Sequence, residues 1–112
     1  MLSKEYRLTK DKELKTVFSS KKGVFDQACG IKIRSTDLPN SRFAFVVGTK
    51  VSKRAVDRNR IRRQYREIVR SFLPEVKGNQ DVILLAGKAS LNLSFEEKEQ
   101  QLRRVFKKGG LL

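Results

Sequence analysis

A sixteen-residue stretch at residues 52–67, "SKRAVDRNRIRRQYRE", carries the side chains with the clearest chemical potential. Seven of its residues are Lys or Arg, six of them Arg, and only Asp57 and Glu67 oppose them. Arginine presents a planar fork of donors that matches phosphate, and it also stacks on bases. The stretch therefore predicts a surface that binds a polyanion, of which nucleic acid is the commonest.

The charge of the whole chain is concentrated in the same region. The 112 residues include 26 Lys and Arg against 12 Asp and Glu, which gives a net charge of +14. Residues 50–70 alone hold nine bases and two acids, so half of the excess lies in 21 residues. A charge run is usually a solvated helix face, but the acids that would balance such a face are missing. We therefore favour binding over solvation.

Residues that build a protein active site are scarce. The chain has no histidine and one cysteine, Cys29, which excludes a histidine base, an internal disulfide and a cysteine-based zinc site. A protein nuclease needs clustered carboxylates that hold magnesium or form an acid–base pair. The densest acids, Glu96, Glu97 and Glu99, lie where a helix is expected to begin, a place that favours acids. We therefore expect no active site on the protein itself.

Secondary structure must position these side chains. We expect helices over residues 9–20, 54–73 and 93–108, strands over 27–35, 42–48 and 81–87, and a short strand around Val24 and Phe25. The runs 42–48 and 81–87 are apolar at nearly every position, so both are predicted to be central strands covered on two faces. Because a helix separates them, we expect them to be parallel.

The helix over 54–73 is predicted to be amphipathic when successive residues are placed 100° apart. Its apolar face comprises Ile61, Tyr65, Ile68, Val69 and Phe72. Its polar face comprises Asn59, Arg63, Arg66 and Arg70. Arg58 and Arg62 lie on one margin of the apolar face, so we expect Arg58 to be partly buried. A membrane-surface helix would carry similar charge, but here the apolar face is needed to close the core.

The N-terminal segment "MLSKEYRLTK" lacks the apolar stretch of a signal peptide, and no apolar run approaches membrane-spanning length. The sequence thus predicts a cytoplasmic protein with no membrane partner. Its length predicts one domain, residues 1–112.

The string "KRAVDRNRIRRQYRE", with Arg58-Asn59-Arg60 at its core, resembles the signature of the bacterial ribonuclease P protein component. Three further segments, "YRLTKDKELKTVF", "RFAFVVGTKVSKR" and "DVILLAGK", are similar to the family's N-terminal segment, its third strand with the following loop, and its last strand. The resemblance covers roughly residues 6–107. It implies an α+β fold: a two-layer α/β sandwich with about four strands in a mixed sheet, three helices, and a left-handed βαβ crossover, as in ribosomal-protein-like folds. General sheet rules alone would favour a right-handed crossover.

The resemblance also implies a function. The protein would be the non-catalytic subunit of ribonuclease P, the endoribonuclease that removes the 5′ leader of precursor tRNA. The catalyst would be a large RNA that uses magnesium, and the protein would hold no cofactor of its own. Its expected partners are the catalytic RNA and precursor tRNA, with no obligate protein partner.

Two groups of site residues follow from matching this sequence to the family. The candidates for contact with the catalytic RNA are Lys50, Lys53, Arg54, Arg58, Asn59, Arg60, Arg62, Arg63 and Arg66. The candidates for the leader-binding cleft, which in the family lies between the first helix and the sheet, are Arg7, Lys10, Leu14, Phe18, Lys32 and Phe95. Asn59 could instead hold a neighbouring loop, and Phe18 could instead be a core residue.

The cleft departs from the family pattern. Leu14 falls where the family often has a phenylalanine, and Lys32 and Phe95 fall where some members have a tyrosine. We therefore expect charge to contribute more to leader binding here than in relatives with more aromatic residues.

Three other functions remain open at this point. A ribosomal-protein-like structural RNA binder would share the outline of the fold. A DNA-binding module would place the arginine helix in a major groove. A protein-only nuclease is disfavoured by the scattered acids.

Overall fold

The computed structural model describes residues 2–112. In chain order they form α1 (Asp11–Phe18), β1 (Gly23–Phe25), β2 (Cys29–Ser35), β3 (Arg42–Val46), α2 (Ala55–Phe72), β4 (Gln80–Ala86) and α3 (Phe95–Lys108). Short 3-10 helices lie at Lys4–Tyr6, Leu73–Glu75 and Lys88–Asn92. No helix among residues 2–112 combines the length and the apolar character that crossing a membrane requires.

The four strands form one mixed sheet in the order β1-β2-β4-β3. Strand β2 is antiparallel to both β1 and β4, and β3 is parallel to β4. The predicted four-stranded mixed sheet with three helices is confirmed, and so is the parallel pairing of the strands that flank the basic helix.

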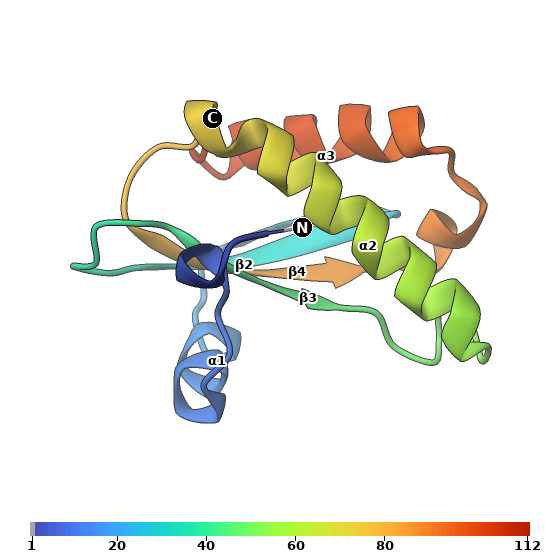
Figure 1. The fold of residues 1–112 in the computed structure, drawn as a ribbon, viewed down its shortest axis with the longest axis horizontal. Helices are drawn as coiled ribbons and strands as arrows, with labels where there is room; N and C mark the ends of the chain where they lie inside the picture. The colour runs from blue at the N-terminus through green and yellow to red at the C-terminus, as the bar shows by residue number, and fades with distance from the viewer. Residues whose placement is uncertain (1) are drawn as a thin grey trace.

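Helices cover both faces of the sheet. Helices α2 and α3 lie on one face and α1 lies on the other (Figure 1). Successive side chains of β4 point to opposite faces of the sheet. Val82 and Leu84 therefore join a large core with α2 and α3, whereas Ile83 joins a small cluster with Leu8 and Val17 on the other face. The two-layer description therefore fits the sheet with α2 and α3, and α1 adds a partial third layer.

Strand β3 is an edge strand, and the prediction that it is central was wrong. Its apolar residues serve both faces: Phe43 and Phe45 pack on the large core, whereas Ala44 packs on the small cluster and Val46 is exposed at the surface. Along the outer edge of β3, the described residues 2–112 form one isolated parallel bridge, between Arg7 and Phe43. There the Leu8 N–H donates to the Phe43 carbonyl at 2.9 Å. An apolar run thus reports coverage of the two faces of a strand and not the number of strands beside it.

Helix α1 is shorter than predicted, and its own residues provide little capping or buried surface to stabilise it. It spans Asp11–Phe18 in place of 9–20, and Lys10 at its N-cap gives no side-chain hydrogen bond to the helix. Val17 is its only buried residue, Leu14 is half-buried, and Phe18 is 40% exposed. Isolated helices of this length are marginal in water, so α1 depends on its contacts with the sheet.

Candidate nucleic-acid interface

The loop before α2 and the first turn of α2 form one hydrogen-bonded unit. The Ser52 hydroxyl donates to Asp57 Oδ2 at 2.9 Å, and Arg58 Nη1 donates to the Ser52 carbonyl at 2.9 Å. Arg58 is half-buried, as predicted. Because this unit fixes the loop, the exposed cations on and beside it occupy a defined position; they are Lys50, Lys53 and Arg54.

The outward side of α2 carries Asn59, Arg60 and Arg63, all exposed. Arg60 lies only at the limit of an ion pair with Asp57, at 4.0 Å. The Asn59 Oδ1 accepts a hydrogen bond from Arg62 Nη1 at 2.9 Å. Asn59 therefore orients a neighbouring arginine of its own helix, and the contacts that hold the preceding loop come from Asp57 and Arg58.

A cleft of about 350 Å³ lies between α1, the N-terminal segment, β3 and α2. Its apolar lining comprises Leu8, Leu14, Phe18, Phe43, Ala44, Phe45 and Val46. Its basic lining comprises Arg7, Arg62 and Arg66. An apolar surface with one exposed aromatic ring, that of Phe18, beside several guanidinium groups is suited to bases and phosphates of a single strand.

Arg66 does not lie on the outward face of α2, where the helical pattern placed it. It is half-buried, and its guanidinium carbon lies 6.0 Å from the centroid of the Phe45 ring. Loss of water around it lowers the pKa of Arg66, and the nearby charges of Arg62 and Arg7 act in the same direction. The cause is the position of β3 at the sheet edge, which turns this margin of α2 toward the cleft.

The predicted leader-binding residues are only partly brought together. Arg7, Leu14 and Phe18 line the cleft, and Lys10 immediately precedes α1. Lys32 lies on β2, where its Nζ donates to the Phe18 carbonyl at 2.7 Å. Phe95, the first residue of α3, packs against the large core and is not among the residues that line the cleft. Helix α3 lies on the face of the sheet opposite α1, so the structure does not bring Phe95 into the cleft with Phe18 (Figure 1).

The cysteine and the group of acids near residue 97 do not form a recognisable reactive site in the described residues. Within residues 2–112, no group of three or more His, Cys, Asp or Glu could hold a metal ion. Burial raises the pKa of the Cys29 thiol to about 12, so it stays protonated. Glu97 and Ser94 form a capping box at the start of α3, where Glu97 Oε1 accepts from the Ser94 N–H at 3.0 Å.

The comparisons with known proteins place this geometry in a family. The family model described as Ribonuclease P matches residues 2–110. The chain belongs to the ribonuclease P protein family. The ribonuclease P protein component of Syntrophomonas wolfei is 36% identical over 99% of this chain and 92% of its own length. That of Symbiobacterium thermophilum is 30% identical over 99% of this chain and 96% of its own.

Solved structures of ribonuclease P proteins share the fold. A Staphylococcus aureus RNase P protein mutant with defective mRNA degradation activity aligns with a TM-score of 0.90 and 21% identity, covering 97% of this chain and 92% of its own. The RNase P protein from Thermotoga maritima aligns with a TM-score of 0.82 and 22% identity, covering 91% of this chain and 96% of its own. The predicted family, the α+β fold and the role as a ribonuclease P subunit are confirmed.

Proposed function

We propose that this ribonuclease P protein binds the catalytic RNA through the outward side of α2 and the loop before it. The contacts would come from Lys50, Lys53, Arg54, Arg58, Asn59, Arg60 and Arg63. All but Arg58 are exposed, and the hydrogen bonds around Ser52 hold the loop against the helix. Cleavage of precursor tRNA would be done by the RNA with magnesium, in the cytoplasm, and the protein would contribute binding and positioning.

We further propose that the single-stranded 5′ leader of precursor tRNA lies in the cleft beside α1. Phe18 would stack a base, Leu14 would give an apolar contact, and the phosphates would meet the cations around the cleft. Those cations are Arg7 and Lys10 together with Arg62 and Arg66, which we transfer from the catalytic-RNA group to the leader group. Lys32 would add positive potential while its ammonium stays on the Phe18 carbonyl.

One observation carries this proposal: Arg62 and Arg66 of the basic helix line the same cleft as the exposed ring of Phe18. The surface proposed for the catalytic RNA therefore continues directly into the surface proposed for the leader. A protein with this arrangement can hold the substrate leader beside the RNA that cuts it, with no catalytic group of its own.

Reconstitution tests the proposal. The purified protein is mixed with a bacterial ribonuclease P RNA and precursor tRNA at low magnesium, where the RNA alone cleaves slowly. We expect faster 5′ cleavage and tighter binding of precursor than of mature tRNA. The control is a variant with Arg60→Ala and Arg63→Ala, which should lose most of the stimulation while melting at nearly the same temperature. Absence of stimulation together with tight binding of duplex DNA would favour a DNA-binding module instead.

A further inference from the structure

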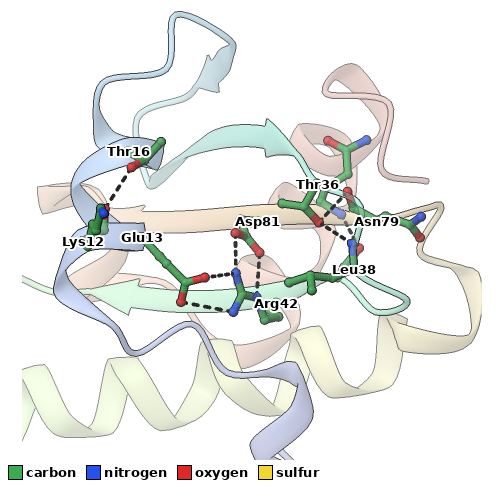
Figure 2. A network of polar contacts seen from close by, with 10 residues as sticks. Lys12, Glu13, Thr16, Thr36, Leu38, Arg42, Asn79 and Asp81 are labelled. Carbon is green, nitrogen blue, oxygen red and sulfur yellow. Dashed lines mark hydrogen bonds and ion pairs between the residues drawn. The ribbon is translucent and has the colours of Figure 1, made fainter.

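Arg42, at the start of β3, joins α1 to the sheet through two carboxylates, a network that we call the Arg42 bridge (Figure 2). On one side, Arg42 Nε and Nη2 donate to the two oxygens of Asp81 at 2.9 and 2.7 Å. On the other, Arg42 Nη2 and Nη1 donate to the two oxygens of Glu13 at 2.8 and 3.2 Å. One guanidinium group thus makes two bidentate contacts, the strongest geometry for such pairs.

The two carboxylates differ in what they need from Arg42. The Asp81 side chain is 1% exposed, and Asp81 is the second residue of β4, directly opposite Arg42 in the sheet. A carboxylate buried to that degree requires a partner, so the Asp81 contact serves the folding of the sheet. The Glu13 side chain is 32% exposed, and water could solvate it in the absence of Arg42. The stability of the sheet therefore does not explain the second contact.

What the Glu13 contact does provide is a fixed place for α1. Because Asp81 fixes the plane of the guanidinium group, the free side of that group points in one direction, and Glu13 must approach along it. Glu13 lies in the first turn of α1, and Phe18 ends the helix about 7.5 Å farther along its axis. At that end the Phe18 carbonyl accepts from Lys32 of β2. Cations of the sheet thus hold α1 at both ends.

Apolar packing alone holds α1 weakly. The cluster beneath it contains only three buried side chains in the described residues, Leu8, Val17 and Ile83. Leu14, Ala44 and Leu85 pack against this cluster but are only partly buried, and Phe18 is 40% exposed and not part of it. The direction in which Phe18 faces the cleft must therefore be set by other contacts.

We infer that Arg42 and Glu13 are positioning residues for substrate: they fix α1 so that Phe18 faces the strand that lies in the cleft. The inference rests on the leader path proposed above. The inference also predicts the direction in which removal of Glu13 changes the affinity for precursor tRNA. Glu13 is a negative charge near an RNA-binding cleft, so removing it should strengthen RNA binding if only charge matters. If Glu13 positions α1, its removal should weaken precursor binding instead.

The test compares Glu13→Gln with Glu5→Gln in the particle reconstituted with ribonuclease P RNA. Both substitutions remove one negative charge from the N-terminal region, and Glu5 lies outside α1. We expect Glu13→Gln to lower the affinity ratio of precursor to mature tRNA by about threefold to tenfold, a part of the value of one stacked base. Glu5→Gln should leave the ratio unchanged or raise it. Glu13→Ala covers the case in which the Gln side chain keeps one hydrogen bond to Arg42.

A second readout separates positioning from a general loss of structure. Because Glu13 acts through Phe18, the effects of Glu13→Gln and Phe18→Ala on the ratio should not add in the double variant. Amide hydrogen exchange should become faster in α1 of Glu13→Gln and stay unchanged in α2. Additive effects, or equal exchange in α1 of Glu13→Gln and Glu5→Gln, would overturn the inference.

The two proposals can fail separately. If Phe18→Ala lowers the ratio while both Glu13 variants behave like Glu5→Gln, the Arg42 bridge does not position substrate and the leader path stands. If Phe18→Ala leaves the ratio unchanged, the leader path is wrong. The substrate role of the Arg42 bridge is then overturned as well, and hydrogen exchange in α1 of Glu13→Gln decides only whether the bridge fixes the helix.

Discussion

The two faces of the sheet carry helices that are held in different ways. Helices α2 and α3 close a core of 18 buried residues within the described chain, including Ile61, Tyr65 and Phe72 of α2. Helix α1 covers a cluster of three and is joined to the sheet by the Arg42 bridge and by Lys32. Helix α2 can therefore expose its arginines without cost to its position, whereas the position of α1 depends on a few contacts that single substitutions can remove.

The largest effect on stability is expected in the α2 core. Ile61 and Ile68 are both fully buried, so Ile61→Ala or Ile68→Ala should lower the free energy of unfolding by roughly 2–5 kcal/mol through lost packing and the cavity left behind. Chemical denaturation measures this. A loss well below that range in both variants would show that the α2 side of the sheet is no better packed than the α1 side.

A smaller effect is expected beneath α1. Val17 is fully buried in the small cluster, and Val17→Ala should lower the free energy of unfolding by about 1–2 kcal/mol, from roughly 0.8 kcal/mol per buried methylene. Val56 of α2 is 69% exposed, so Val56→Ala provides the same chemical change without loss of burial. Hydrogen exchange in α1 should rise for Val17→Ala alone. An equal rise in α2 would argue against separate anchoring of the two helices.

The smallest effect on the stability of α1 is expected when the pH is lowered and Glu13 becomes protonated. The hydrogen bonds from Arg42 lower the pKa of Glu13 below its ordinary value of 4.5, and the charges of Lys10 and Arg34 add to this. Because the folded pKa is the lower one, the contribution of Glu13 is fully present above pH 4.5 and is lost as the pH falls through the folded value. Exchange in α1 should therefore rise in acid before exchange in α2.

Glu13→Gln is the control for the acid experiment. This variant should show no such early rise in α1, because it lacks the group that titrates. The same acid response in the variant and in the unaltered protein would mean that another carboxylate loosens the helix.

Much of the fold could be predicted because periodicity and capping are local properties. The amphipathic pattern of α2 predicted its buried face correctly. The helix between the apolar runs 42–48 and 81–87 predicted that these two strands pair in parallel, as β3 and β4 do. The edge position of β3 could not be predicted, because strand order depends on pairing between segments far apart in the chain. That Phe95 lies outside the cleft could not be predicted either, because no local pattern states which face of a sheet a helix covers.

In the candidate site, too, features set by local sequence patterns could be predicted, and features set by contacts between distant segments could not. The exposed cations of α2 follow from its helical pattern, but Arg66 turned out to face the cleft because β3 lies beside that margin. The Arg42 bridge joins three elements through residues that are 29 and 39 positions apart. The one available signal was a charged residue at the start of each apolar run, Arg42 and Asp81, which suggests a pair if the strands are neighbours in register.

The central claim is that the two helices serve two RNA partners, and one set of binding measurements tests it directly. Affinity for ribonuclease P RNA, and the precursor-to-mature affinity ratio of the particle, are measured for Arg63→Ala and Phe18→Ala. We predict that Arg63→Ala weakens binding of the catalytic RNA and keeps the ratio. Phe18→Ala should keep catalytic RNA binding and lower the ratio by roughly fivefold to a hundredfold, as expected for a lost stacked base worth about 1–3 kcal/mol. If both variants change the same quantity, the division between α2 and the α1 cleft is wrong.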